Sequence, residues 1–530
     1  MQETDVLIVG GGPTGVTLAL ELAIHGIPFR IIDKELQRSD KSRALAIQPR
    51  TLELLNRHGD VERLIAQGIP NEGPIFYLNG KQAADINNLG LAEDTAFPLI
   101  LVVSQCETEA YLDECLAKYG FAVERGLEAK SIIQDSEGVT VKLGKEDGTE
   151  EAVRAKYVVS ADGAHSIVRK AANGLTFQGA AYPQDFILCD ASIQNSNLAW
   201  NRISLCMGRG SLAVFPLKNG TVRVVLSRVD PKPDVEPTLQ DFQTMLDQLL
   251  PGAGELYDPT WITQFHLHHR GVNSYRDRRL FIAGDAAHIH SPAGAQGMNT
   301  GIQDAINLGW KLATVIKGER LETFLDSYDC ERRPIGQHLL ESSDKIFTWG
   351  CSTNPLFVTF RNVLFTWALP WYVNSRSRRS SLYKFISELG ISYSDSPFVG
   401  TGSGFPGLIK GGDRFPDSKV LSNGNEGYFL KHLSPASYSL VLFSGVGRSK
   451  VTKNTMLEAR SKFNLNRAKL HLILHGTIDA DHEFEHADIE NRLHENFGCL
   501  QAFYVYVRPD GYIEYIVLLS ELNGLSKWLE

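Results

Sequence analysis

The chain of 530 residues is too long for a single hydrophobic core, so we expect about two to four domains. Its residues are 43% hydrophobic and 22% charged, which is ordinary for a globular protein and excludes a disordered chain. A net charge of −9 with no offsetting basic block argues against nucleic acid as a partner.

The cysteines and the N-terminus both favour the cytoplasm. The seven cysteines are scattered, with no C-x-x-C pair, which is typical of a reducing compartment and indicates neither a disulfide framework nor a zinc site. The N-terminus leads directly into a predicted strand, without the features of a signal peptide.

The first predicted unit spans residues 4–33 and is typical of a nucleotide-binding βαβ fold. A buried strand at residues 6–9 precedes Gly10, Gly12 and Gly15 in G-x-G-x-x-G spacing, and a helix and a second strand ending at Asp33 follow. The glycines permit a tight turn, close approach of a pyrophosphate and close helix packing, while Asp33 is placed to bind ribose hydroxyls. The motif leaves NAD, NADP and FAD open as ligands.

A loop and several short elements follow. Residues 34–42 form a polar loop before Arg43, and helices are expected at 51–57 and 61–67. Residues 75–101 have strand-and-turn character with a hairpin at Asn79-Gly80, and Gln105 precedes a helix at 107–119.

A second acid follows a later strand. Strands are expected at 129–134, 139–143 and 152–159, and the last leads into Asp162-Gly163 and a helix start. The carboxyl end of a strand is where ligands bind in open α/β sheets.

Residues 177–270 change to consecutive strand patterns, interrupted by one helix at 239–250. We expect a mostly antiparallel sheet that is inserted into the nucleotide-binding domain. Such a sheet could cover a pocket for a second, less polar ligand.

The chain then returns to the first domain. A buried strand at 279–283 ends in Gly284-Asp285, and a loop leads to a helix at 298–315. Asp285 can bind the hydroxyls of a polyol, and the positive end of this helix would stabilise a ring that gains negative charge on reduction. Adenosine, polyol and reducible ring together describe FAD better than NAD.

Helical patterns continue to about residue 389. The apolar stretch 355–373 contains Arg361, Asn362 and Pro370, which argue against a membrane-spanning helix. We expect a buried or dimer-interface helix, with peripheral membrane contact as a lesser alternative.

A Gly/Ser/Pro-rich stretch at 394–416 predicts a domain boundary before a compact α/β pattern. Strands are expected at 439–443, 469–474, 502–507 and 513–518, and helical segments at 457–463 and 485–495.

The motifs in this order resemble the class A flavoprotein aromatic hydroxylases, which have the p-hydroxybenzoate hydroxylase fold. The resemblance covers residues 4–395 and rests on five motifs: Gly10-x-Gly12-x-x-Gly15, Asp162-Gly163-x-x-Ser166-x-x-Arg169, Gly284-Asp285-Ala286-Ala287-His288, Pro292-x-Gly294-x-Gln296-Gly297-x-Asn299 with Asp304, Asn307 and Trp310-Lys311-Leu312, and Tyr328-x-x-Glu331-Arg332-Arg333-Pro334. The tail resembles the thioredoxin-like C-terminal domain of the phenol hydroxylase and polyketide hydroxylase branch, through Gly412-x-Arg414-x-Pro416-Asp417 and Arg508-Pro509-Asp510-Gly511.

The resemblance implies an α/β fold in four parts. These are a first part of an FAD-binding Rossmann-like domain at 1–175, with 75–101 joining the substrate sheet, an antiparallel substrate sheet at 176–270, a second FAD-binding part with a helical region at 271–395, and a thioredoxin-like domain at 396–530. Without C-x-x-C, the last part is expected to have a structural or dimer-supporting role.

The resemblance also implies the roles of single residues around FAD. Asp33 would bind the adenine ribose, Asp162 the pyrophosphate region and Asp285 the ribityl chain. Arg43 and Gln105 would contact the phosphates, Pro292 would lie near the reactive carbon of the flavin, and Gly297, Met298 and Asn299 would present backbone N–H groups to the flavin ring.

The implied reaction is a hydroxylation. NAD(P)H, bound transiently, would reduce the flavin, O₂ would form a C4a-hydroperoxide, and oxygen would pass to a phenolic, aromatic or polyketide-type small molecule. No side-chain base or nucleophile is identified, and a homodimer is conceivable.

Other readings remain open from the sequence. The same flavin chemistry supports Baeyer–Villiger oxidation or epoxidation, and the first motif alone would suit an NAD-dependent dehydrogenase or a non-catalytic nucleotide-fold binding protein. The spacing of His288 and His290 with Asp285 could suggest a metal site, but the family motif explains Asp285 and His288 without a metal.

Overall fold

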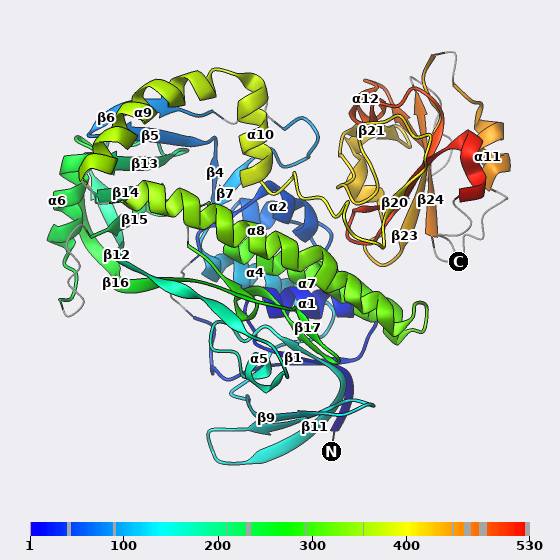
Figure 1. Cartoon of the computed structure of the whole chain (residues 1–530), viewed down its shortest axis with the longest axis horizontal. Helices are drawn as coiled ribbons and strands as arrows, with labels where there is room; N and C mark the ends of the chain where they lie inside the picture. The colour runs from blue at the N-terminus through cyan, green and yellow to red at the C-terminus, as the bar shows by residue number, and fades with distance from the viewer. Residues whose placement is uncertain are drawn as a thin grey trace.

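The computed structural model describes residues 2–39, 44–87, 92–208, 210–228, 235–291, 294–352, 355–447, 450–460, 468–475 and 485–524. Within them the chain forms three eight-stranded sheets and a small three-stranded sheet. Figure 1 shows the N-terminal part in blue at the centre, an extended green sheet beside it and the C-terminal part in orange and red.

The first sheet, which we call the parallel sheet, is built around β1. β1 pairs in parallel with β2 on one side and β11 on the other, and β18 pairs in parallel with β11. The continuous burial of Val6, Leu7, Ile8 and Val9 explains their apolar run, because both faces of the sheet are covered. In sheet order the strands are β17 (Arg276–Asp277), β18 (Leu280–Ile282), β11 (Glu150–Ser160), β1 (Gln2–Val9), β2 (Phe29–Asp33) and β8 (Glu124–Arg125), with β10 (Val139–Gly144) and β9 (Glu128–Gln134) as an antiparallel extension.

Two helices cover the centre of the parallel sheet. α1 (Pro13–Ile24) leaves the glycine turn, and α7 (Gly297–Ile316) packs along it. At Gly309 the two helices are so close that an added Cβ would lie 2.4 Å from the Cβ of Glu21, so a larger residue could not maintain this packing. The other elements of this region are α2 (Pro49–Leu55), α3 (Glu62–Ile65), α4 (Gln105–Lys118) and α5 (Ile167–Ala171), with β3 (Ala46–Ile47), β7 (Ile100–Val102) and β4 (Ile69–Asn71) in the three-stranded sheet.

The second sheet, which we call the antiparallel sheet, has five of its strands between β11 and β18 in the chain, while β5 and β6 precede β11 and β19 follows β18. Its one parallel pair is β13 with β5, and α6 (Leu239–Leu249) packs on one face through Phe242, Leu246 and Leu249. In sheet order its strands are β19 (His288–Ile289), β16 (Glu255–Val272), β12 (Phe177–Gln194), β15 (Thr221–Ser227), β14 (Gly210–Pro216), β13 (Ile203–Gly208), β5 (Pro74–Leu78) and β6 (Lys81–Asp85).

Three consecutive helices follow α7: α8 (Asp326–Cys351), α9 (Pro355–Val373) and α10 (Arg376–Ile386). α8 crosses the molecule between the parallel and antiparallel sheets, and α9 and α10 form an arch above them (Figure 1). Large side chains of α9 are exposed, including Trp367 and Trp371, so the expectation that this helix is buried is wrong for its outward face. Among the residues described, no helix is both long and apolar enough to cross a bilayer.

The third sheet forms the C-terminal part. Its centre combines a parallel pair, β23 with β24, and two antiparallel pairs, β23 with β26 and β26 with β27. In sheet order the strands are β20 (Gly400–Thr401), β27 (Ile513–Leu518), β26 (Phe503–Val507), β23 (Tyr438–Phe443), β24 (Ala468–His475), β25 (Glu485–Asp488), β21 (Lys419–Ser422) and β22 (Asn425–Tyr428), with α11 (Lys453–Arg460) and α12 (Arg492–Phe497) beside them.

The prediction of a helix at 485–495 is wrong for residues 485–488. Residues Glu485–Asp488 form β25, which pairs in parallel with β24, and all four are buried. Helix propensity is a weak preference, and here pairing with a neighbouring strand outweighs it.

Candidate active site

The carboxyl ends of β18, β11, β1 and β2 meet at one edge of the parallel sheet, and this edge is the candidate site. Backbone hydrogen bonds hold the ends together: Gly10 N donates to Ile32 O at 2.8 Å, and Ala161 N donates to Val9 O at 2.7 Å. Gly10, Asp33, Asp162 and Asp285, which are far apart in sequence, therefore lie at the same edge.

The three motif glycines meet different steric demands. Gly10 has φ of +111°, and an added Cβ would lie 2.2 Å from Ala161 O. A Cβ on Gly15 would lie 1.9 Å from Gly10 O, whereas one on Gly12 would have no neighbour within 4 Å. Gly10 and Gly15 are thus needed by the fold, and Gly12 borders open space at the N-terminus of α1. No side chain among the described residues caps that terminus, which leaves its positive end available to an anion.

Asp33 is held by backbone donors at the end of β2. Its carboxylate accepts from Gly11 N at 2.6 Å and from Glu35 N at 2.8 Å. These bonds fix the carboxylate next to the glycine turn.

Asp162 and its neighbours brace the start of α5. Asp162 accepts from Ile167 N at 2.8 Å, and Ser166 accepts from Arg169 N at 2.9 Å. Arg169 donates to Ala286 O at 2.7 Å, so it ties this segment to the loop after β18. Capping and bracing therefore account for the hydrogen bonds of Ser166 and Arg169.

Asp285 is exposed at the tip of the loop after β18, whereas Gly284 beside it is buried. An added Cβ on Gly284 would lie 2.6 Å from the hydroxyl oxygen of Thr14, and one on Gly301 of α7 would lie 2.5 Å from the same atom. The glycine turn, this loop and α7 thus converge within van der Waals contact.

The N-terminus of α7 faces the same region without a side-chain cap from the described residues. Asn299 is fully buried; it accepts from Gln48 N at 2.8 Å and donates to Ala46 O at 3.0 Å. Its side chain thus joins α7 to β3, and the first backbone N–H groups of the helix, from Gly297 to Asn299, have no intrahelical acceptor.

Of the remaining predicted site residues, the structure describes Gln105 and Met298. Gln105 begins α4, accepts from Ala44 N at 3.3 Å and donates to Glu109 at 2.8 Å. Met298 packs against the core of the parallel sheet. Arg43 and Pro292 lie outside the described residues.

A buried charged group behind the site centres on Asp304, which belongs to the family motifs but to which the sequence assigned no role. Asp304 of α7 is fully buried, accepts from Gly284 N at 3.1 Å and from Arg332 Nε at 2.7 Å, and contacts His288 Nε2 at 2.9 Å. Burial alone would raise the pKa of Asp304, but Arg332 and His288 outweigh this effect and lower it. The carboxylate thereby fixes the loop that carries Asp285.

Glu388, two residues after the end of α10, is an acid that sequence reasoning missed. Its carboxyl group accepts from Thr300 Oγ1 at 3.3 Å and from Gln303 of α7. Burial raises the pKa of Glu388 to about 8, so the group is mostly protonated at neutral pH. The motif residues gave no signal for it, because it follows them by a long stretch of chain.

His290 lies near the N-terminus of α7. A Cβ on Gly297 would lie 2.9 Å from His290 Nε2, while His290 Nδ1 bonds Ser291 O at 2.8 Å. Burial lowers the pKa of His290 to about 4, so the imidazole is neutral at pH 7.

The antiparallel sheet presents an apolar row on the face away from α6. The row follows from strand register: Phe76 lies opposite Leu205, Leu205 opposite Ala213, Ala213 opposite Val225, and Val225 opposite Leu188. Their chain neighbours Cys206, Val214 and Val224 belong to the core under α6, so the row faces the other way. The sheet also continues into the site, because Gly271 of β16 pairs with His288 of β19.

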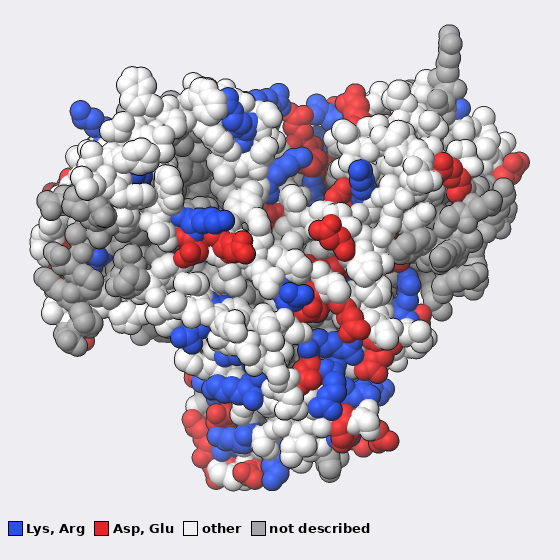
Figure 2. Space-filling view, viewed as in Figure 1, with Lys and Arg blue, Asp and Glu red and all other residues white. Residues whose placement is uncertain are grey.

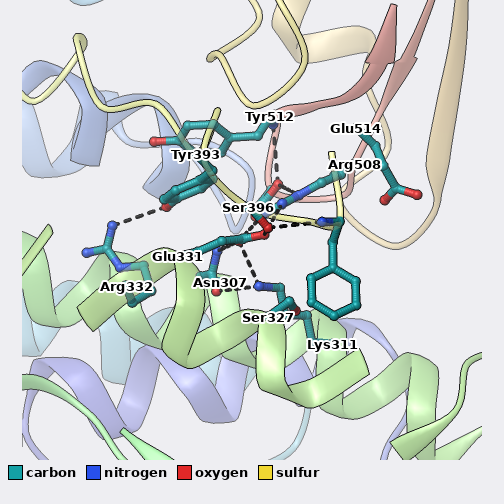
Figure 3. Close-up of polar contacts among 12 residues, drawn as sticks. Asn307, Lys311, Ser327, Glu331, Arg332, Tyr393, Ser396, Arg508, Tyr512 and Glu514 are labelled. Atoms are coloured by element: carbon teal, nitrogen blue, oxygen red, sulfur yellow. Dashed lines mark hydrogen bonds and ion pairs between the residues drawn. The ribbon is translucent and has the colours of Figure 1, made fainter. Parts of the chain in front are cut away.

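A buried ionic cluster joins the site region to the C-terminal part (Figure 3). Glu331 of α8 accepts from Lys311 at 2.7 Å and from Arg508 at 2.8 and 2.9 Å. Asn307 and Ser396 donate to the same carboxylate at 2.8 and 3.1 Å. Burial would raise the pKa of Glu331, but Arg508 and Lys311 lower it to about 2. Arg508 also pairs with Asp510, which accepts from Trp310 Nε1 at 3.1 Å.

One edge of the parallel sheet thus brings together an acid at the end of β2, a glycine turn at the N-terminus of α1, an acid in the loop after β18 and the uncapped N-terminus of α7, as expected for a flavoprotein of the class A hydroxylase type. Residues 3–343 match the family model described as an FAD binding domain. The chain belongs to this family of FAD-dependent monooxygenases, with the α/β fold expected from its motifs.

Relatives cover most of the chain. It is 31% identical over 526 residues to 6-methylpretetramide 4-monooxygenase of Streptomyces rimosus, covering 96% of this chain and 90% of that protein. It is 32% identical over 426 residues to pentachlorophenol 4-monooxygenase of Sphingobium chlorophenolicum, covering 79% and 76%. The solved structure of OxyS anhydrotetracycline hydroxylase from Streptomyces rimosus matches with a TM-score of 0.76 and 28% identity, covering 100% of this chain and 98% of that one.

Proposed function

We propose that the enzyme uses NAD(P)H and O₂ to hydroxylate a phenolic, aromatic or polyketide-type small molecule. The observation that carries the proposal is the apolar row Phe76–Leu205–Ala213–Val225–Leu188 on a sheet that continues into the FAD-binding edge. The relatives named above, which act on a pretetramide and a chlorinated phenol by their names, support the same substrate class.

The open space at Gly12 and the uncapped N-termini of α1 and α7 fit FAD, since each provides backbone room or positive potential for it. We assign the pyrophosphate to the turn Gly10, Gly12 and Gly15, the adenine ribose to Asp33, and the ribityl chain to Asp285. Arg43, Gln105 and Asp162 would support the phosphate region, and Pro292, Gly297, Met298 and Asn299 would border the flavin ring.

When bound, FAD supplies the redox chemistry that activates O₂ for transfer to the substrate ring. The side chains of this protein position the reactants and exclude water. The apolar row would pack against the face of an aromatic ring, and its lack of polar groups would keep water from the reacting centre. His290 stays neutral at pH 7, so it adds no positive charge beside the N-terminus of α7.

The substrate class is tested by screening phenols and polycyclic phenols for stimulated NADPH and NADH oxidation by the FAD-loaded protein. We expect a phenolic compound to stimulate oxidation and to gain one oxygen atom, measured by mass spectrometry. NMR of the product separates ring hydroxylation from epoxidation and Baeyer–Villiger ring insertion. Stimulation by no aromatic compound, or only peroxide release, would contradict the proposal.

A variant in the apolar row distinguishes an effect on substrate binding from an effect on FAD binding. Ala213→Trp should fill the centre of the row, so substrate should no longer stimulate NADPH oxidation while FAD content stays at the parent level. Ser192→Trp, on the same sheet but outside the row, is the control.

We infer that the enzyme works in a reducing compartment such as the cytoplasm. The side chains of six cysteines are described, and four of them, Cys115, Cys189, Cys206 and Cys499, are buried and unbridged. Mass spectrometry of protein isolated under thiol-blocking conditions should find them reduced.

A further inference from the structure

α9 presents a continuous row of large apolar side chains to the outside. The exposed fractions are 60% for Phe360, 57% for Val363, 78% for Trp367 and 65% for Trp371. Their spacing of three or four residues places them on one side of the helix. We call these four residues the α9 face.

The one charged residue of α9 points in the opposite direction. Arg361 is fully buried and donates to the carbonyls of Gly350 at 2.7 Å, Trp349 at 3.0 Å and Gly208 at 3.3 Å. A surface helix normally turns its charged residues to water and its apolar residues to the core. α9 reverses this arrangement, which indicates that the α9 face meets an apolar environment.

The neighbouring helix α10 is basic. It carries Arg376, Arg378, Arg379 and Lys384 and no acidic residue, in a chain whose net charge is −9. Glu93 forms an ion pair with Arg376 at 2.5 Å, so the helix and its surroundings together keep an excess of positive charge. Arg378 stacks on Trp371 with its Cζ 3.5 Å from the ring centroid, so positive charge directly borders the α9 face. In Figure 2 the upper left of the molecule, where α9 lies, is mostly white, with blue atoms at its margins.

We propose that the α9 face and the adjoining basic side chains of α10 dock the enzyme on an anionic lipid surface. Apolar side chains enter the boundary between headgroups and acyl chains, tryptophan favours that boundary, and nearby arginine and lysine are attracted to anionic headgroups. A second copy of the chain is the less complementary occupant. In a two-fold dimer the basic residues of α10 would lie near the same basic residues of the other copy and would repel them. Only the apolar side chains of the α9 face would then find a complementary partner. The docking does not depend on the proposed substrate class.

The test is flotation of the FAD-loaded full-length protein with vesicles of phosphatidylcholine alone or mixed with phosphatidylglycerol. We expect flotation with the mixed vesicles, weaker flotation with phosphatidylcholine and a loss with rising salt concentration. The double variant F360S/W367S should reduce partitioning by about tenfold or more, because it removes two of the four apolar anchors. R376Q/K384Q leaves the α9 face intact and should weaken binding only to the anionic vesicles.

The matched control is W200S/L500S, which removes two exposed apolar side chains elsewhere and should float like the parent. FAD absorbance and NADPH oxidation without vesicles should be unchanged in all variants, which shows that they are folded. The proposal is overturned if the parent floats with neither vesicle type or if F360S/W367S floats equally well. It is also overturned if light scattering finds a parent dimer that F360S/W367S converts to a monomer, because the α9 face would then belong to a second copy.

Discussion

Gly12 and Gly15 stand three residues apart in one turn, but the structure restricts them for different reasons. Gly15 is enclosed by backbone atoms, whereas Gly12 has ordinary extended dihedral angles, φ −81° and ψ −176°, and open space beside it. Alanine therefore suits Gly12 in the protein alone and would compete only with a ligand. Substitutions at the two positions therefore distinguish an effect on folding from an effect on the proposed binding of FAD.

Gly12→Ala is expected to fold with a melting temperature of the FAD-free protein close to that of the parent, while binding FAD at least about tenfold more weakly. Gly15→Ala should lower the melting temperature of the FAD-free protein itself, because its methyl group would collide with Gly10 O. Thermal unfolding and flavin fluorescence titration measure the two effects. Equal FAD affinity in Gly12→Ala and the parent would place the pyrophosphate elsewhere.

Asp285→Asn tests the ribityl site. Loss of a charged acceptor for FAD hydroxyls should weaken FAD binding by about tenfold or more without changing the stability of the FAD-free protein, because the side chain is exposed. Asp258→Asn, an exposed acid on the antiparallel sheet, should bind FAD like the parent. Unchanged flavin content in Asp285→Asn would contradict the assignment.

Among the helices, α7 links most of the site. It carries Asn299 toward β3, Asp304 toward the Gly284–Asp285 loop and Gln303 toward Glu388 after α10. A helix held by so many buried polar contacts has little freedom to move, so its N-terminus is rigid, as the proposed contact with the flavin ring requires.

Glu388→Gln tests the contact between α7 and the segment after α10 through its pH dependence. The pKa of Glu388 is about 8 in the folded protein and ordinarily 4.5, so between these pH values the folded protein holds more protons than the unfolded chain. Stability from this group is therefore lost as the pH rises from about 4.5 to 8. Glutamine is always neutral, so the variant should gain about 2 kcal/mol or more over the parent between pH 5 and pH 8. Denaturant unfolding at the two pH values measures the gain, and a constant difference between variant and parent would show that Glu388 stays ionised.

The motifs that were read from sequence are local, and the contacts that were missed are not. The βαβ unit was predictable, because the signals for its turn, helix and second strand follow one another directly between Gly10 and Asp33. Asp304, Arg332 and Glu388 come together only after several helices have packed. No short sequence spacing predicts their contacts. The apolar row depends on the register of strands from Phe76 to Val225, and Glu485 to Asp488 became a strand only because β24 lies beside it.

At the scale of the whole molecule, the cluster around Glu331 fixes the C-terminal part to the rest. Every charged side chain of this cluster is at most 2% exposed, so the removal of one partner leaves an uncompensated charge. The ion pair of Arg492 with Glu93, which also joins the C-terminal part to the rest, is different, because the two side chains are 48% and 53% exposed and water can replace either partner.

Arg508→Leu is expected to destabilise the protein by about 3–5 kcal/mol, whereas Arg492→Gln should cost about 1 kcal/mol or less. Differential scanning calorimetry should show the C-terminal part of Arg508→Leu unfolding before the rest. Limited proteolysis should cut that variant first between residues 394 and 416. If Arg508→Leu melted as a single transition at the parent temperature, the cluster would not be what holds the two parts together.

The strand order of the parallel sheet has a consequence for the newly made protein. β1 is synthesised first, but its neighbour β11 follows only after residue 149, β18 after residue 279 and α7 after residue 296. Such long-range pairing delays folding and leaves apolar strands unpaired while the ribosome continues. If FAD binds at this edge as proposed, the nascent chain cannot complete its cofactor site until more than half of it has been translated.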